Sequence, residues 1–127
     1  MGKKILIVDD DPDFTEAIST LLESNGYDIL SAPNAKEGLL KAKSEKPDLM
    51  LLDVMMTTKT EGFDMALKLK EDNDTKNIPI IMVTGIRRDL NLSFGFEPDE
   101  NWMPVKSVIE KPVKPEVLLK KISDNIN

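Results

Sequence analysis

The 127-residue sequence contains no cysteine and no histidine. Without cysteine the chain has no disulfide, no thiol nucleophile and no thiolate metal site. Without histidine it lacks the commonest metal ligand and the usual general base of enzymes. Any chemistry must therefore use carboxylates, hydroxyl groups and lysines.

Long apolar runs and an excess of positive charge are missing as well. No run approaches the roughly 20 apolar residues that a membrane span requires, and the apolar stretch near the N-terminus is too short for a signal peptide. The formal net charge of −6 argues against nucleic acid as a direct partner. We therefore expect a cytoplasmic protein with no direct nucleic-acid partner and no membrane contact.

Length and composition predict a single globular domain over residues 1–127. Hydrophobic residues make up 40% of the chain and charged residues 31%, as in folded soluble domains. A chain of this length can bury a sizeable core. No linker, internal repeat or low-complexity segment divides it.

Short apolar runs predict the strands of a parallel sheet. The run Leu49–Met56 is interrupted only by Asp53, and such a continuous run indicates a strand buried on both faces, with Asp53 at its end. The other expected strands are Lys4–Val8, Tyr27–Ser31, Ile80–Val83 and Ser107–Ile109.

Segments with helical periodicity separate these strands. A stripe of apolar residues follows Pro12 and indicates a helix; it consists of Phe14, Ala17, Ile18, Leu21 and Leu22. Asn34 is expected to cap a second helix, and Lys46–Pro47 to end it. Two further helices are expected from Phe63 to Glu71 and from Pro115 onward. This alternation predicts an α/β fold with right-handed crossovers.

Polar residues stand where the predicted strands end. Asp9 and Asp10 follow the first strand, Asp53 ends the third, Thr84 ends the fourth, and Lys111 follows the fifth. In a parallel sheet these ends share one edge, where ligands bind. Three carboxylates there repel one another unless positive charge lies among them. Lys111 supplies one positive charge, and Mg²⁺, which prefers oxygen ligands, would supply the rest.

These residue types fit a phosphoryl-transfer site, where catalysis consists mainly of positioning and charge neutralisation. Asp53 would be the nucleophile and form an acyl phosphate. The expected metal ligands are Asp9, Asp10, Asp53 and the backbone carbonyl of Met55. The hydroxyl of Thr84 and the ammonium of Lys111 would bind phosphoryl oxygens.

Each of these residues also has a purely structural explanation. An Asp-Asp-Asp-Pro run is often only a helix cap, Asp53 and Thr84 can belong to turns, and Lys-Pro is common at surfaces. Taken singly, the two explanations carry equal weight. The joint occurrence of these residues at successive strand ends favours the functional interpretation.

Four motifs make the chain resemble a response-regulator receiver domain of the CheY-like superfamily, from two-component signalling. They are Ile-Leu-Ile-Val-Asp-Asp-Asp-Pro, Leu-Leu-Asp-Val-Met-Met, Val-Thr-Gly and Glu-Lys-Pro, and together they span nearly the whole chain. The resemblance implies a doubly wound, flavodoxin-like α/β/α sandwich with a five-stranded parallel sheet in the order 2-1-3-4-5. It also implies Mg²⁺-dependent phosphorylation of Asp53 by a histidine kinase, a phosphotransfer protein or a small phosphodonor.

The same resemblance implies a signalling phosphoacceptor rather than an enzyme. Only self-phosphorylation from phosphodonors and self-dephosphorylation are expected, and the phosphorylation state would switch contacts with a downstream protein. That protein would bind a surface of this chain, or the chain would be one domain of a larger regulator. Receivers also pair through the face of their fourth and fifth helices, which makes a homodimer there a further expectation.

Two features depart from the family pattern. The aromatic switch residue expected three positions before the lysine is Val108 here. The segment 87–106 has no helical or strand period. It makes the sequence separation between Thr84 and Lys111 longer than in the family, so we expect an atypical fourth-helix region.

Three alternatives remain. The chain could be a pseudo-receiver, a phosphorylation-independent interaction module, which Val108 favours and the intact set of site residues opposes. A phosphatase of the haloacid-dehalogenase type would need a second aspartate where Met55 stands. A nucleotide-binding Rossmann domain would need a Gly-x-Gly-x-x-Gly run after the first strand, and none is present.

Overall fold

The computed structural model describes residues 3–53, 61–84, 107–110 and 113–126, and for residues 61–64, 84, 107–108 and 110 it describes the backbone only. The expected roles of Met55 and Lys111 and the expected irregular segment 87–106 lie outside the described residues. The same holds for the fourth-helix part of the expected dimer face.

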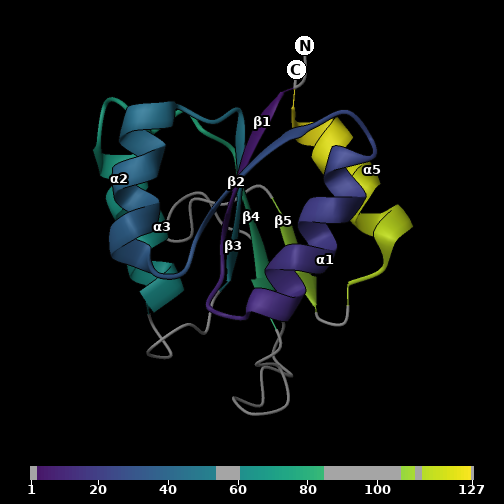
Figure 1. The fold of residues 1–127 in the computed structure, drawn as a ribbon. Coiled ribbons are helices and arrows are strands. Elements are labelled where there is room, and N and C mark those ends of the chain that lie inside the picture. Colours follow the sequence, from purple (N-terminus) through teal and green to yellow (C-terminus); the bar gives the residue numbers. More distant parts are fainter. Residues whose placement is uncertain (1–2, 54–60, 85–106, 111–112, 127) are drawn as a thin grey trace, which may run out of the picture.

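Five parallel strands form one sheet that is covered by helices on both faces (Figure 1). The elements are β1 (Lys4–Val8), α1 (Pro12–Glu23), β2 (Asp28–Ala32), α2 (Ala35–Glu45), β3 (Leu49–Asp53), α3 (Glu61–Glu71), β4 (Ile80–Thr84), β5 (Ser107–Glu110) and α5 (Pro115–Asn125). The strand order β2-β1-β3-β4-β5 confirms the predicted doubly wound, three-layer fold. Within the described ranges, no helix combines the length and apolarity needed to cross a membrane.

The register of the sheet aligns the carboxyl ends of its inner strands. Val8 lies beside Leu52, and Asp53 lies beside Val83. Thr84 lies beside Glu110 at the end of β5. Whatever follows β1, β3, β4 and β5 therefore starts from the same edge of the sheet.

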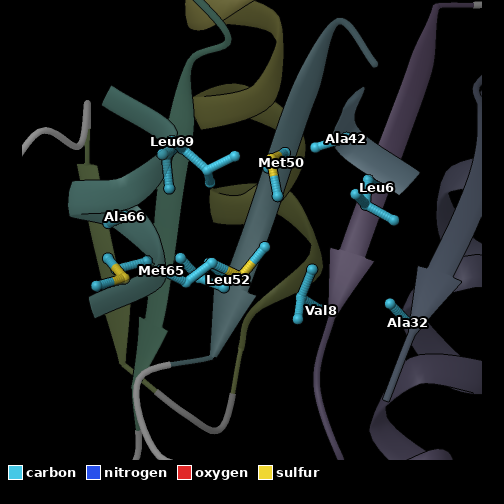
Figure 2. Close-up of a cluster of buried hydrophobic side chains, with 11 residues drawn as sticks. Leu6, Val8, Ala32, Ala42, Met50, Leu52, Met65, Ala66 and Leu69 are labelled. Atoms are coloured by element: carbon cyan, nitrogen blue, oxygen red, sulfur yellow. The ribbon is translucent and has the colours of Figure 1, made fainter. Parts of the chain in front are cut away.

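Residues of β1, β3 and β4 alternate between two separate cores. One core lies under α2 and α3 and contains Leu6, Val8, Ala32, Ala42, Met50, Leu52, Met65, Ala66, Leu69, Ile80 and Met82 (Figure 2). The other lies under α1 and α5 and contains Ile5, Ile7, Ile18, Leu22, Leu49, Leu51, Ile81, Ile109, Leu118 and Ile122. Because both faces are buried, the sequences of β1 and β3 read as continuous apolar runs, as predicted.

Helix α1 begins and ends through local hydrogen bonds. At its start, the side chain of Asp11 accepts from the backbone of Asp13 and Phe14. At its end, Gly26 adopts a left-handed φ of 90°, and the N–H of Tyr27 donates to Leu22 O at 3.1 Å. This last bond keeps Tyr27 within the helix-terminating turn, so β2 runs from Asp28 to Ala32 and the predicted strand Tyr27–Ser31 is shifted by one residue.

One other prediction about the helices needs correction, and two are confirmed. Ala17, which was expected in the apolar stripe of α1, is exposed, because the buried part of the helix is centred on Ile18 and Leu22. Helix α3, Glu61–Glu71, confirms the helix predicted from about Phe63 to Glu71. The expected cap at Asn34 is confirmed by its bond from the N–H of Glu37 at 2.9 Å.

The outer edge of β2 is the free edge of the sheet on that side. Asp28 and Ala32 direct their backbone toward β1, because Asp28 N donates to Lys3 O and Ala32 O accepts from Asp9 N. Ser31 directs its carbonyl the opposite way, and this oxygen accepts a hydrogen bond from the Nζ atom of Lys41 on α2.

Two side-chain interactions hold the connection between α3 and β4 in place. The hydroxyl of Thr75, which is buried, donates to Leu69 O at 2.7 Å. Lys43 of α2 forms an ion pair with Asp72, with 2.8 Å between Nζ and Oδ2. The ion pair thus joins α2 to the turn that follows α3, next to the core that the two helices share.

Candidate functional site

The two buried acids of the described structure lie at the carboxyl edge of the sheet. Asp53 is the last residue of β3 and Asp9 directly follows β1, its neighbour in the sheet. Both are 4% exposed. Asp10, the next residue in the chain, is exposed to solvent.

The three carboxylates converge on one point. One oxygen from each of Asp9, Asp10 and Asp53 lies within 4.8 Å of the others. Two buried and one exposed carboxylate at such separations repel one another and favour a bound cation. A set of carboxylate oxygens, open to water through Asp10, suits a hard divalent ion such as Mg²⁺, which keeps several of its waters. The residues that are present therefore fit this metal.

Asp9 is held in place by its neighbours in the sheet and in α1. Its backbone N–H donates to Ala32 O of β2 at 3.1 Å. Its Oδ1 atom accepts from the backbone N–H of Asp11 at 2.9 Å. The bond to Asp11 was not predicted, although aspartate side chains often accept from the N–H two residues further on. Because every residue except proline offers such an N–H, the Asp-Asp-Asp run allows this hydrogen bond but does not by itself predict it.

The remaining expected site residues are only partly described. The backbone of Thr84 ends β4, next to β3 in the sheet, and stands beside Glu110. Lys111 directly follows Glu110 in the sequence. The Thr84 hydroxyl, the Lys111 ammonium and the Met55 carbonyl lie outside the described atoms, so their expected roles stay predictions.

The sequence matches the family described as the response regulator receiver domain over residues 5–123. The chain belongs to this family. The receiver assignment, made first from four motifs, is thereby confirmed, and the chain is a receiver domain of two-component signalling.

Several relatives resemble this receiver domain over most of its length. Protein PilH of Pseudomonas aeruginosa is 34% identical over 120 residues, which cover 94% of each chain. The phosphate regulon transcriptional regulatory protein PhoB of the same species is 38% identical over 96% of this receiver domain but only 51% of its own length. The receiver domain thus spans about half the length of PhoB.

Solved structures share the fold. A CheY-like receiver domain protein from Methanospirillum hungatei has a TM-score of 0.81 at 33% identity, covering 98% of this receiver domain and 93% of that chain. The receiver domain of a sensor histidine kinase from Pseudomonas aeruginosa, with a magnesium ion coordinated in its active site cleft, has a TM-score of 0.83 and covers 98% of each chain. At 19% identity this second likeness concerns the fold alone.

Proposed function

We propose that this receiver domain accepts a phosphoryl group on Asp53 with the help of Mg²⁺ and thereby switches its contacts with other proteins. The observation that carries the proposal is the convergence of Asp9, Asp10 and Asp53 within 4.8 Å at the carboxyl edge of the sheet. The choice of metal is supported by the oxygen donors of this cluster, which are the ligands that Mg²⁺ prefers. A cytoplasmic location and a histidine kinase or phosphotransfer protein as donor belong to the same proposal.

The transfer is an in-line displacement at phosphorus. A carboxylate oxygen of Asp53 attacks, and the bond between phosphorus and the donor's imidazole nitrogen or acetate oxygen breaks, with its electron pair leaving on the donor. Asp53 is buried at the end of a fully buried strand, which limits the directions that the attacking oxygen can take. A metal held by Asp9, Asp10, Asp53 and the Met55 carbonyl would neutralise charge on the phosphoryl oxygens. Thr84 and Lys111 are the proposed partners of those oxygens.

The chain acts in this proposal as an acceptor and not as an enzyme with turnover. Phosphorylation of Asp53 places about two negative charges at physiological pH beside the buried carboxylate of Asp9 and the exposed carboxylate of Asp10, and this change would alter which partner surface the domain binds. Self-phosphorylation from small donors and self-dephosphorylation are the only reactions that we assign to it.

The test is the intact mass of the protein after incubation with acetyl phosphate, with and without Mg²⁺. We expect the wild type to gain one phosphoryl group only when Mg²⁺ is present, and Asp53→Asn to gain none. Asp13→Asn changes an exposed acid in the first turn of α1 and serves as the charge-matched control; it should react like the wild type.

A phosphorylation-independent interaction module remains the rival proposal. It is favoured by Val108, the residue of β5 that stands in the position of the family's aromatic switch. A folded wild-type protein that gains no phosphoryl group from acetyl phosphate, phosphoramidate or a kinase would select this rival.

A further inference from the structure

The start of α1 is bonded directly to a carboxylate of the acidic cluster. Asp11 belongs both to the cap of α1 and to the hydrogen bonding of the acidic cluster. Its backbone N–H donates to Asp9 Oδ1 at 2.9 Å, while its own Oδ1 atom accepts from Asp13 N at 3.0 Å and from Phe14 N at 3.3 Å. Its carbonyl accepts from Thr15 N at 3.0 Å.

These bonds fix the backbone of Asp11 on both sides. A helix start leaves several N–H groups without partners inside the helix, and a capping side chain satisfies them only when its own backbone is extended. Asp11 has this geometry, with φ −92° and ψ 105°. The cap therefore determines where the N–H of the same residue is directed, and here it is directed at Asp9.

We propose that Asp11 is a positioning residue for the metal site. Its side chain caps α1, the cap orients its N–H, and the N–H holds the Asp9 carboxylate in the orientation that binds Mg²⁺. The inference rests on the proposed function, because it assumes that Asp9 binds the metal. It assigns Asp11 no direct contact with the metal.

Capping and charge can be separated at this position. Asparagine and serine cap helices about as well as aspartate, whereas alanine does not. Asp11→Asn and Asp11→Ser remove the negative charge but keep an acceptor oxygen for Asp13 N and Phe14 N. Asp11→Ala removes both. Asp13→Asn removes a nearby exposed charge and leaves the cap intact.

Mg²⁺ affinity, measured by isothermal titration calorimetry on the folded proteins, is the first readout. We expect Asp11→Ala to weaken binding by about fivefold, less than the roughly tenfold loss usual when an outer-shell partner is removed outright, because the N–H remains. Asp11→Asn, Asp11→Ser and Asp13→Asn should stay within about twofold of the wild type, because the cap that positions Asp9 is kept.

Amide hydrogen exchange of residue 11 in the metal-free protein is the second readout, because it reports the hydrogen bond to Asp9 independently of any metal. We expect slow exchange in the wild type, Asp11→Asn and Asp11→Ser, and faster exchange in Asp11→Ala. Thermal unfolding of each variant checks that the protein is folded under the conditions of the calorimetry and of the exchange measurement.

The outcomes separate this inference from the proposed function. If the wild type binds Mg²⁺ and Asp11→Ala binds it equally well, Asp11 does not position the site. If Asp11→Asn is weakened as much as Asp11→Ala, charge or direct coordination explains the effect, and the inference is wrong. If the wild type binds no Mg²⁺, the proposed function itself fails and the inference falls with it.

Discussion

The two faces of the sheet are packed with different kinds of side chain. Under α1 and α5, all buried core residues of the described structure are isoleucine or leucine. Under α2 and α3, three methionines and three alanines share the core with leucine, isoleucine and valine. Isoleucine is stiff because it branches at Cβ, whereas methionine is unbranched and fills irregular gaps. The α1/α5 face is therefore a rigid core, and the α2/α3 face is an adaptable one.

Helix α2 also lies close to β1 on the α2/α3 face. A Cβ atom added to Gly38 of α2 would lie 2.7 Å from Met65 Cε and 2.9 Å from Val8 Cγ2. Glycine thus lets α2 lie close to β1, and the end of the Met65 side chain fills the space beside it. One face thus gains its stability from interlocking branched side chains, and the other from small residues with flexible fillers.

The largest expected effect comes from truncating a buried leucine on each face. Leu22 in α1 and Leu69 in α3 are both fully buried. Leu22→Ala should lower the free energy of unfolding by about 3 kcal/mol, within the range seen for buried leucines. Leu69→Ala should lower the free energy of unfolding by about 1 kcal/mol less than Leu22→Ala does, because methionines of the same core can move into the cavity. Urea unfolding of the two variants measures both values, and an equal or larger loss for Leu69→Ala would contradict the comparison.

Adding one carbon to α2 tests how closely the helix can pack. Gly38→Ala gains about 1 kcal/mol of helix propensity but overpacks the contact with Val8 and Met65, which typically costs about 1–3 kcal/mol. We expect a net loss of about 1 kcal/mol in the free energy of unfolding. Combining Gly38→Ala with Met65→Leu, which withdraws the nearest atom, should recover part of it in the same assay. A double variant that is less stable than Gly38→Ala alone would show that Met65 does not fill this space.

Neighbouring residues of β4 provide a matched pair across the sheet. Met82 belongs to the α2/α3 core and Ile81 to the α1/α5 core. Exchanges that conserve volume usually cost less than about 1.5 kcal/mol. Within that limit, Met82→Leu should cost less than Ile81→Met, because the rigid core accepts a change of shape less readily. Thermal unfolding of the two variants side by side decides the order, and the reverse order would remove the distinction between the faces.

The smallest expected effect concerns the exposed ion pair between Lys43 and Asp72. The hydrogen bond to Lys43 lowers the pKa of Asp72 below its ordinary 3.8, and the hydrogen bond to Asp72 raises the pKa of Lys43 above its ordinary 10.5. The pair therefore stabilises the fold at neutral pH. Its contribution is lost as the pH falls through the lowered pKa of Asp72, and again as the pH rises through the raised pKa of Lys43.

Lys43→Met should accordingly reduce the free energy of unfolding slightly at pH 7, and this loss should shrink as the pH falls through the lowered pKa of Asp72. High salt should diminish the difference at pH 7. Lys36→Met, at an exposed lysine on the same helix, is the control for lost charge alone. A loss at pH 7 that persists unchanged as acid protonates Asp72 would mean that the lysine stem, and not the ion pair, stabilises α2 against the turn.

Most of the fold could be predicted because the two cores leave a simple pattern in the sequence. The strands β1 and β3 are apolar except for Lys4 and Asp53 at their ends. Pro12 and Pro47 mark helix ends through their backbone, and Asn34 marks one through its capping side chain. The start of β2 was missed by one residue because the hydrogen bond from Tyr27 to Leu22 belongs to a three-dimensional helix end. The burial of Ala17 was predicted wrongly because a small residue is tolerated on both the buried and the exposed face of a helix. Periodicity alone therefore does not show that it is buried.

The acidic cluster was predictable for a related reason. Once the strands are parallel, Asp9, Asp10 and Asp53 must share an edge, whatever the detailed packing. What the sequence did not indicate was how Asp9 is oriented, because this depends on a backbone N–H, and every residue except proline carries one. Whether a given N–H points at a carboxylate is decided by local dihedral angles, which residue types constrain only weakly.

The contact between Lys41 and the carbonyl of Ser31 has a consequence for how the molecule behaves in a crowded solution. A free sheet edge is a template on which other chains can add strands, and repeated addition leads to aggregates. At β2 an outward carbonyl that an incoming strand would need is already bonded to a charged side chain, and Asp28 adds an exposed carboxylate to the same edge. A strand approaching this edge would have to displace a lysine and leave its charge without that partner, which opposes the addition of a further strand at β2.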